Sequence, residues 1–206
     1  MNKDLYLKWI HELQAISQIG LTYTQDPFDK QRYLAIQSLS AEMAEHCSEL
    51  SQEKILKLFS QESGYCTPKL DVRGVVFRDN KILMVRERED NLWTLPGGWA
   101  DVNESPSEAV VREIFEESGY KTQAIKLLAL YDKQKHDHPP QWPHAYKCFF
   151  LCDLIAGKPQ LNIEISEIQF FGQHELPELS KHRITEAQIL RFFAHFANST
   201  WPTDFD

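Results

Sequence analysis

The sequence predicts a mixed α/β domain preceded by a small all-α domain. Apolar residues in the first third recur mainly at helical spacing, whereas β-branched and aliphatic runs dominate from about residue 68 onward, interrupted by two helical patterns. The residue pattern changes from helix-like to strand-like between Gly64 and Pro68. We therefore expect a helical domain over residues 1–66 and an α/β domain over residues 67–206.

The chain has the composition of a globular protein with an acidic balance. Hydrophobic residues make up 42%, and 22 Lys and Arg stand against 30 Asp and Glu, for a net charge of -8. This excludes a disordered chain and disfavours a protein that binds long nucleic acids, which need clustered positive charge. No apolar run approaches the ~20 residues of a membrane span. The N-terminal residues lack the apolar core of a secretory signal, and no CxxC pair occurs. We expect mostly buried thiols, a cytoplasmic location and no membrane partner.

Helical patterns fill the first domain. Residues 4–18 form one roughly amphipathic pattern. Asp26 and Pro27 suit an N-cap and a first helical position, so a second helix is expected to run from there to about Cys47. A third is expected to begin at Ser51, to continue through Leu58 and Phe59, and to end before Gly64. The second helix is expected to turn four apolar residues toward a core: Tyr33, Leu34, Ile36 and Leu39. Three short helices can bury their apolar residues only against one another or another surface, which suggests a second copy of the chain.

The second domain alternates strands with helices. Residues 72–77 and 81–87 flank the turn signal Arg78-Asp79-Asn80 and are predicted to form a hairpin. A final helix is expected to begin at Thr185, which forms a capping box with Gln188. Further strands are predicted over residues 92–95, 125–131, 146–154 and 168–171. Aromatic residues at helical spacing in the final helix are expected in the core: Phe192, Phe193 and Phe196.

A helix over residues 106–118 is marked at both ends. Ser105 suits the N-cap, Pro106 the first position, Glu108 completes a capping box, and Gly119 suits a left-handed stop. At about 100° per residue, one face is apolar and another acidic. The apolar face holds Val110, Val111, Ile114 and Phe115, and the acidic face Glu113, Glu116 and Glu117.

The acidic face requires compensation. Glu113 stands three and four residues before Glu116 and Glu117, spacings at which like charges repel within a helix. A solvated helix face is the ordinary explanation of such glutamates. A hard divalent cation is the alternative, because Mg²⁺ prefers carboxylate oxygens and water.

The surrounding segment resembles the signature of the Nudix hydrolases, Gly-x5-Glu-x7-Arg-Glu-U-x-Glu-Glu-x-Gly-U, where U is a bulky aliphatic residue. Tyr120 stands at the last aliphatic position, which is a packing position. Asn103 replaces the glycine often found before the first glutamate, and Asn also tolerates left-handed geometry. The matching positions are Gly98, Glu104, Arg112, Glu113, Ile114, Glu116, Glu117 and Gly119.

The resemblance implies an α/β/α sandwich with a mixed sheet and hydrolysis of a pyrophosphate bond in a nucleoside diphosphate linked to a group X. It implies that Glu113, Glu116 and Glu117 bind Mg²⁺ or Mn²⁺, with the Gly97 carbonyl as an extra ligand. Glu104 would support the helix or complete the metal site, and Arg112 would orient the glutamates.

The resemblance leaves the general base open. A carboxylate must take the proton of the attacking water. Within the family this is a glutamate of the signature or an acid of a later loop. The later candidates are Glu164 and Glu167, which could equally be solvated loop acids.

The whole chain is similar to a bacterial Nudix subgroup with a helical N-terminal domain. The similarity rests on the helices, on Tyr65-x-Thr67-Pro68-Lys69-x-Asp71-Val72-Arg73, and on the His- and Pro-rich loop before Tyr146-Lys147. Members are described as CDP-choline or ADP-ribose pyrophosphatases and are typically dimers. We therefore expect a small nucleotide conjugate as substrate and a homodimer.

Other side chains are candidates for substrate binding. His136, His138 and His144 share one loop and could bind zinc, contact substrate, or do neither. Trp99 could stack on a base or pack under its loop. Candidates for phosphate contacts are Arg73, Arg86, Lys135, His136 and His144, although the arginines could also lie on solvated strand faces.

Two other functions compete with hydrolysis of a small conjugate. Removal of pyrophosphate from RNA 5′ ends would need a basic channel, which the acidic composition does not indicate. A non-catalytic, nucleotide-sensing Nudix module would tend to lose the glutamates of the signature, and this chain keeps them all.

Overall fold

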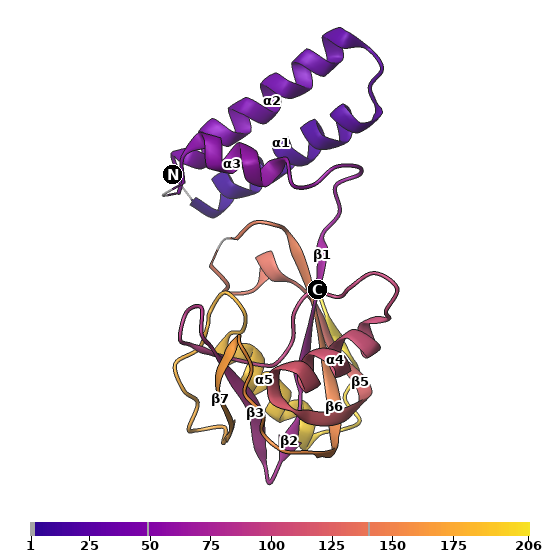
Figure 1. Ribbon diagram of the computed structural model, residues 1–206, viewed down its shortest axis with the longest axis vertical. Coiled ribbons are helices and arrows are strands. Elements are labelled where there is room, and N and C mark those ends of the chain that lie inside the picture. The colour runs from indigo at the N-terminus through magenta and orange to yellow at the C-terminus, as the bar shows by residue number, and fades with distance from the viewer. Residues whose placement is uncertain (1–2, 49, 140) are drawn as a thin grey trace. The chain divides into compact units, whose positions relative to one another are not determined.

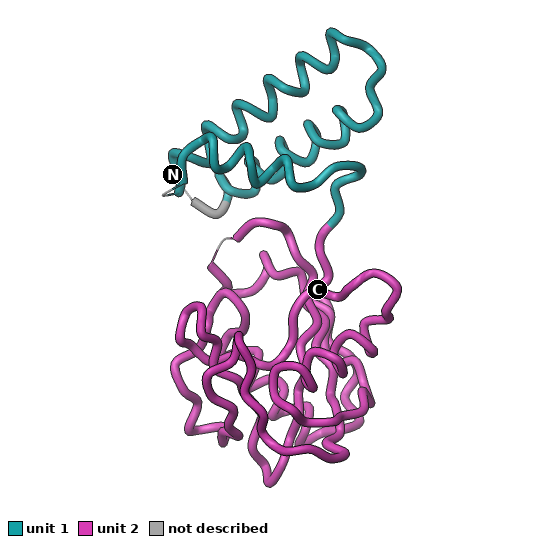
Figure 2. The backbone as a smooth tube through the Cα atoms, in the orientation of Figure 1, with its two compact units in different colours: residues 1–67 teal, residues 68–206 magenta. Residues whose placement is uncertain are grey.

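We describe the protein from a computed structural model, which covers residues 3–48, 50–139 and 141–206. The chain divides into two compact units, residues 1–67 and 68–206 (Figure 2). The first is entirely helical in its described part, and the second combines strands with helices (Figure 1).

Unit 1 (residues 1–67) consists of α1 (Lys3–Tyr23), α2 (Pro27–Glu45) and α3 (Gln52–Phe59). The Asp26 carboxylate caps α2 by accepting from the amides of Phe28 and Asp29, at 2.7 and 2.9 Å. This confirms the predicted cap, because the oxygen satisfies amides that have no partner within the helix. Gly20 allows α1 and α2 to approach closely, since a Cβ there would lie 2.3 Å from the Tyr33 ring.

The apolar surface of unit 1 is only partly buried. The small core includes Ile10, Ala41, Ile55 and Phe59. The prediction that Leu34 and Leu39 face this core is wrong, because 46% and 52% of their surfaces stay exposed. Other large exposed apolar residues of this unit are Leu5, Trp9, Ile16, Tyr23, Phe28, Leu50 and Tyr65.

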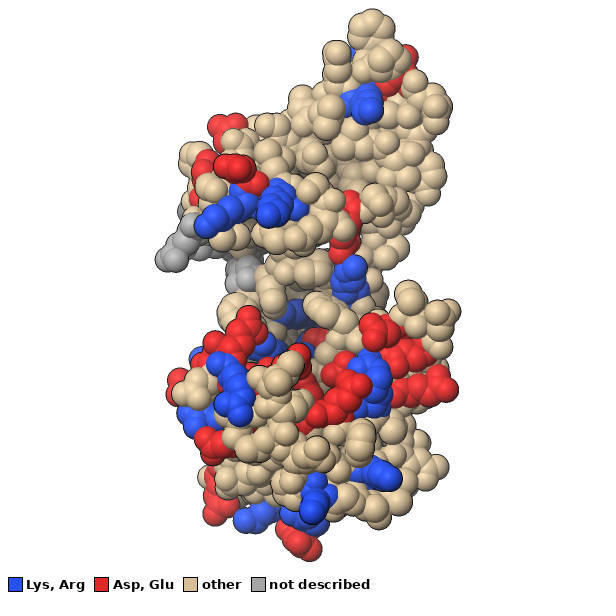
Figure 3. Space-filling view, in the orientation of Figure 1, with Lys and Arg blue, Asp and Glu red and all other residues tan. Residues whose placement is uncertain are grey.

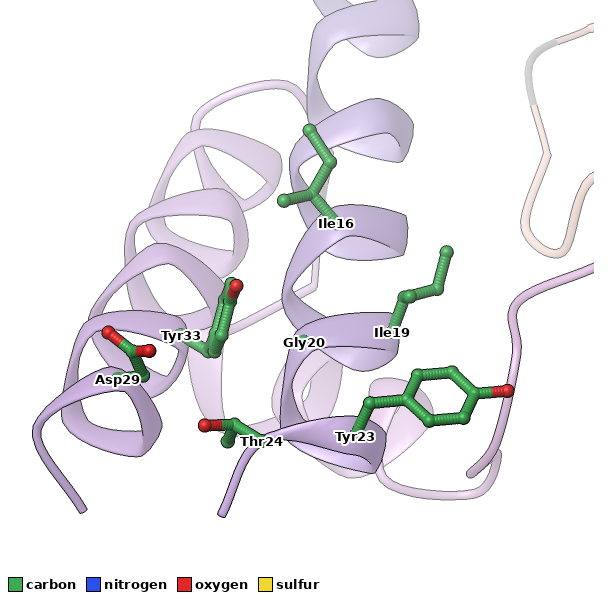
Figure 4. A pocket seen from close by; sticks show the side chains of 7 residues that line it. All are labelled: Ile16, Ile19, Gly20, Tyr23, Thr24, Asp29 and Tyr33. Atoms are coloured by element: carbon green, nitrogen blue, oxygen red, sulfur yellow. The ribbon is translucent and has the colours of Figure 1, made fainter. Parts of the chain in front are cut away.

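A pocket of about 460 Å³ lies along α1 and the start of α2 (Figure 4). Its lining is mainly apolar and aromatic, with Thr24 just after α1 and Asp29 on α2. The remaining lining residues are Ile16, Ile19, Gly20, Tyr23 and Tyr33.

Unit 2 (residues 68–206) contains two sheets. In the first, β1 (Lys69–Val75) pairs in parallel with β6 (Ala145–Gly157), which pairs antiparallel with β5 (Tyr120–Asp132). β5 also pairs with β8 (Asp204–Phe205). In the second, β3 (Lys81–Glu87) pairs with β2 (Phe77–Arg78), β4 (Trp93–Thr94) and β7 (Ile165–Phe171).

Two helices complete the α/β/α sandwich. α4 (Pro106–Ser118) buries Ala109, Val110 and Ile114 in one core. α5 (Glu186–Ala197) buries Ile189, Phe192 and Phe193 in another. In the sheets between them, neighbouring residues of a strand lie on opposite faces. The fold is therefore the mixed α/β fold that the sequence predicts.

Several local predictions need correction. The predicted strand 72–77 is divided: Val72–Val75 belong to β1, and only Phe77 and Arg78 form the hairpin with β3. The missed elements are β8 and a short 3-10 helix over Lys133–Lys135. Phe196 is 43% exposed, so its predicted core position is wrong. Cys148 and Cys152 are buried, Cys47 and Cys66 half-buried, and all four are free thiols.

None of the described helices is long and apolar enough to cross a bilayer.

Candidate active site

The acidic helix α4 is fixed at both ends. Ser105 accepts from the Glu108 amide while the Glu108 carboxylate accepts from the Ser105 amide, so the predicted capping box is present. Gly119 ends the helix at φ 74°, and a Cβ there would lie 2.6 Å from the Lys158 carbonyl oxygen. Asn103 adopts φ 69° in the preceding loop, and Tyr120 is buried, as predicted.

The glycine loop lies against the last turns of α4. Gly97 has φ 142°, and a Cβ there would lie 2.0 Å from the Val72 carbonyl oxygen, so the close approach to β1 requires glycine. The Gly97 amide donates to Glu117 Oε2 at 2.9 Å. Gly98 also packs against α4, because a Cβ at this position would lie 3.0 Å from Glu113 Oε1. The loop and the acidic face of α4 therefore form one site.

Arg112 organises the carboxylates around it. Its Nε and Nη2 donate to both oxygens of Glu104, at 3.0 and 2.6 Å. Its Nη1 donates to Glu113 at 2.9 Å and to Glu116 at 3.0 Å. The hydrogen bonds from Arg112, followed by one from the Asp101 amide, lower the pKa of Glu104 to about 2. In Figure 3, acidic atoms surround basic atoms where α4 reaches the surface.

Burial opposes ionisation at the deeper glutamates. Glu117 is 5% exposed, and loss of solvation raises its pKa to about 8, assisted by the charges of Glu87 and Glu113. Burial likewise raises the pKa of Glu113. Glu87, at the end of β3, also has a pKa raised by burial, although Arg183 lies 3.2 Å from its carboxylate. A cation at this site would stabilise the ionised carboxylates.

The chemistry of this donor set fits a hard divalent metal. Carboxylates that are buried, mutually repulsive and raised in pKa gain most from a cation with oxygen ligands. Within the described residues, however, no group of three or more His, Cys, Asp or Glu side chains converges as a metal site. Glu113 and Glu116 point to Arg112 instead. Metal binding would therefore require these two carboxylates to turn from Arg112 toward Glu117.

A cavity of about 500 Å³ adjoins the glycine loop. One part of its lining consists of two carboxylates and the arginine that pairs with them: Glu89 and Asp90 form ion pairs with Arg183 at 2.5 and 2.8 Å. Other parts of its lining include Asp71, Arg73, Gly98, Trp99, Lys133 and Gln141. Arg73 and Trp99 thus line the cavity, and their role in substrate binding stays a prediction.

Buried charges stand behind this cavity. The β1–β6 register pairs Asp71 with Lys147, and Lys147 Nζ donates to Asp71 at 2.6 Å. Arg73 also donates to Asp71, at 2.7 and 3.3 Å, and to the Leu95 carbonyl at 3.2 Å. Despite burial, the arginine and the lysine lower the pKa of Asp71 to about 2. Burial lowers the pKa of both Lys147 and Lys133 to about 8.

Sequence reasoning missed Asp71, Lys133, Lys147 and Glu87 as site residues. A signal was available for two of them. Asp71 is four residues from the buried Val75 in β1, and Lys147 is two residues from the buried Phe149 in β6, so each charged residue shares the strand face of a buried apolar residue. Charged residues at inward-facing strand positions are rarely buried without a partner or a function.

The histidine loop does not form a metal site. His144 Nε2 lies 2.8 Å from Asp132, and His136 Nε2 lies 3.2 Å from Asp206. His138 contacts the Lys181 carbonyl at 2.8 Å. The three histidines therefore do not converge on one point within the described residues. His136, His144 and the exposed Lys135 lie outside the described cavity lining.

The remaining candidates also lie away from the cavity lining. Arg86 pairs with Glu167 at 2.5 Å and donates to the Asn91 carbonyl. Glu164 is exposed, and its backbone carbonyl accepts from the Arg88 amide. In this structure the cavity therefore gathers Arg73 and Trp99, but not Arg86, Glu164 or Glu167.

Comparison with known families matches both units. The family described as "UDP-X-like, N-terminal oligomerisation domain" matches residues 4–59. The NUDIX domain family matches residues 67–193.

Known proteins are similar over most of the chain. A Bacillus subtilis protein provisionally named as an ADP-ribose pyrophosphatase, YjhB, is 46% identical over 202 residues, 97% of each chain. The crystal structure of a UDP-X diphosphatase is 36% identical, covers the whole of both chains and has a TM-score of 0.64. A Streptococcus suis ADP-ribose pyrophosphatase structure is 39% identical, covers 68% of this chain and all of its own, and has a TM-score of 0.63.

These matches agree with the geometry of α4 and its glycine loop. The glycine loop of unit 2 contacts the signature glutamate Glu117 through Gly97 and lines the cavity through Gly98. The chain belongs to the Nudix hydrolases, in the subgroup with a helical N-terminal domain, and is a pyrophosphohydrolase.

Proposed function

We propose that the protein hydrolyses the pyrophosphate bond of a small nucleoside diphosphate linked to X, in a Mg²⁺-dependent reaction. The products would be a nucleoside monophosphate and a phosphorylated X. The observation that carries this proposal is the hydrogen bond from Gly97 to Glu117, because it joins the acidic helix to the loop that lines the cavity.

Relatives narrow the choice of substrate. ADP-ribose is the first candidate, because two similar proteins are named for its hydrolysis. UDP conjugates follow from the UDP-X diphosphatase, and CDP-choline from the subgroup resemblance. Trp99, half-exposed at the cavity, has the flat apolar surface on which a base would stack.

Glu113, Glu116 and Glu117 would hold the metal, with Gly97 and Glu104 as further candidates. Bound Mg²⁺ would neutralise charge on the diphosphate and make water more nucleophilic. Arg112 would keep Glu104 and the helix carboxylates in position through its ion pairs. Glu117, with a pKa near 8 before metal binding, can exchange a proton near neutral pH.

The helical unit supports a homodimer. Its exposed leucines and aromatic residues exceed what its small core buries, and its family is described as an oligomerisation domain. We propose that this surface packs against a second copy of the chain.

A substrate panel with product identification tests the proposed function. The full chain is incubated with ADP-ribose, CDP-choline, UDP-sugars, dinucleoside polyphosphates and triphosphorylated RNA, each with Mg²⁺, Mn²⁺ or a chelator. The proposal expects a nucleoside monophosphate from one of the small conjugates, and none with the chelator. Hydrolysis of RNA alone, or of no conjugate, would refute it.

A further inference from the structure

One wall of the cavity in unit 2 gathers buried positive charge around a single buried carboxylate. Arg73, Lys133 and Lys147 are all at least nine-tenths buried, and Asp71 is the carboxylate directly paired among them. Three cations and one anion leave a formal excess of two positive charges. Buried charges are costly unless they are paired, so this excess requires an explanation.

Asp71 is already fully engaged by two of the cations. Lys147 contacts one of its oxygens at 2.6 Å, and Arg73 contacts both, at 2.7 and 3.3 Å. Lys147 lies behind Asp71 and is absent from the cavity lining, whereas Arg73 and Asp71 face the cavity. Lys147 and Asp71 therefore act mainly to hold Arg73 at the cavity wall.

Lys133 has only a neutral partner among the described side-chain contacts. Its Nζ donates to the Gln141 side-chain oxygen, and within the described ion pairs no carboxylate lies within reach of it. It follows β5 in the short 3-10 helix and lines the same cavity as Arg73. An ammonium so deeply buried beside an open cavity is placed to receive an anion from outside.

The carboxylates near Arg73 do not remove this excess at Lys133. Glu87 and Glu117 are the other acids whose charges act on Arg73, and neither belongs to the cavity lining. Glu87 contacts Arg183, and Glu117 accepts from the Gly97 amide. The acids that line the cavity, Glu89 and Asp90, are bound to Arg183.

We propose that Lys133 and Arg73 form an anion subsite that binds one phosphate group of the nucleotide conjugate. Nη1 and Nη2 of Arg73 each keep one N–H beyond their bonds to Leu95 and Asp71. These two groups and the Lys133 ammonium, at a wall shared with Gly98 and Trp99, suit a diphosphate placed between this subsite and the acidic helix. The inference rests on the proposed function for the identity of the anion. It adds Lys133 as a substrate-binding residue that discriminates nucleotides from nucleosides.

Metal-free ADP binding tests the subsite. The full chain is titrated in a chelator with ADP and, separately, with adenosine, so that the acidic helix contributes no metal-mediated contact. Lys133→Met should weaken ADP binding about tenfold or more, because a charged hydrogen bond is lost. Adenosine binding should stay unchanged. Lys133→Arg should retain most of the ADP affinity, and Lys121→Met, at an exposed position on β5, should behave as the unaltered chain.

A second variant covers the case in which Lys133→Met does not fold. Gln141→Glu places a carboxylate on the atom that now accepts from Lys133, and Gln141 is exposed. The new carboxylate should occupy the subsite and weaken ADP binding to a similar extent. ADP affinity that is unchanged in both variants, or ADP and adenosine affinities that fall together, would overturn the inference.

Turnover separates this inference from the proposed function. Binding of ADP that depends on Lys133, in a chain that hydrolyses no conjugate, would support the subsite and refute the proposed function. Hydrolysis of a conjugate with the same KM in the unaltered chain and in Lys133→Met would do the reverse.

Discussion

Glu117 is a carboxylate in a place that disfavours its charge. Its side chain is nearly inaccessible, its neighbours include Glu113 and Glu87, and a single backbone amide donates to it. Arg73 acts in the opposite direction, but burial dominates, so the pKa rises to about 8. Without a ligand, a site of this kind lowers the stability of the folded protein, and the binding of a cation raises it again.

Replacing Glu117 tests the metal assignment. Glu117→Gln keeps the acceptor for the Gly97 amide and removes the negative charge. We expect kcat to fall by at least about a hundredfold, in the range seen when a group that stabilises charge in the transition state is lost. Steady-state kinetics on the best substrate of the panel measures this, and circular dichroism checks the fold. Near-normal turnover would contradict the assignment.

The raised pKa of Glu117 also predicts a pH-dependent stability. The folded pKa is about 8 and the ordinary value is 4.5, so the folded chain holds the proton more tightly. Stability is therefore full below about pH 4.5 for this group and is lost as pH rises toward 8. Without metal, the free energy of unfolding should fall by on the order of a few kcal/mol between pH 5 and 7.5.

Denaturant titrations in a chelator measure this fall. Glu117→Gln is the matched control, because it cannot ionise, and its stability should depend less on pH over the same range. Saturating Mg²⁺ should flatten the dependence of the unaltered chain. An equal fall in both proteins would contradict the role of Glu117.

The signature residues could be predicted individually because their spacing is local. Glu104, Arg112 and the three helix glutamates lie within one loop and one helix, and the structure brings them together around Arg112. Lys133 and Lys147 could not be predicted in this way. Their place beside Arg73 depends on the pairing of β1 with β6 and on the turn that follows β5, which connect distant parts of the sequence.

At the scale of elements, α4 depends on its two loop junctions. Asn103 and Gly119 both adopt positive φ, but they differ in surroundings. Asn103 is exposed, whereas Gly119 packs against the backbone of Lys158. The first junction tolerates a side chain, and the second has no room for one.

Alanine substitutions should reveal this difference. Asn103→Ala should cost less than about 1 kcal/mol of unfolding free energy, because Asn is itself an L-residue and the substitution loses only its greater tolerance of left-handed geometry. Gly119→Ala should cost clearly more, because its Cβ would also lie 2.6 Å from a carbonyl oxygen. Denaturant midpoints of the two variants measure both costs. Equal costs would show that the chain around Lys158 yields easily.

Elements marked by local signals were predicted well, and pairings between distant elements were not. The caps of α2, α4 and α5 lie where the sequence places them, because capping depends on neighbouring residues. The hairpin was assigned too many residues, since the apolar run that continues into Phe77 gives no indication that Val72–Val75 pair with β6 instead.

At the scale of the whole molecule, the two units differ in how much they bury. Unit 2 has two continuous cores, one under each of α4 and α5. Unit 1 leaves Leu34, Leu39 and other large apolar residues exposed, and residues other than Lys, Arg, Asp and Glu cover much of its visible face in Figure 3. An apolar surface of this kind favours association.

Removing the helical unit tests this role. A chain that begins at residue 65 should have fewer subunits, or lower solubility, than the full chain, while its metal affinity changes little. Light scattering coupled to size-exclusion chromatography gives the subunit number. A truncated chain that stays monodisperse with the same subunit number would contradict the proposed dimer interface.

A double substitution offers a milder test in the full chain. Leu34→Glu with Leu39→Glu introduces repelling charges on α2 and should lower the subunit number. Ile155→Glu is the control, because Ile155 is also exposed and apolar but belongs to β6 in unit 2. Loss of association only in the control would place the interface in unit 2.

The parallel pairing of β1 with β6 sets an order of events while the protein is being made. Lys69 pairs with Ala145, so 145 − 69 = 76 further residues must be synthesised before β1 can pair with β6. At a synthesis rate of about 5–20 residues per second, this takes roughly 4–15 seconds. The contacts within α1, α2 and α3 need only the first 67 residues. The helical unit can therefore fold, and present its apolar surface to another nascent chain, before the catalytic sheet can close.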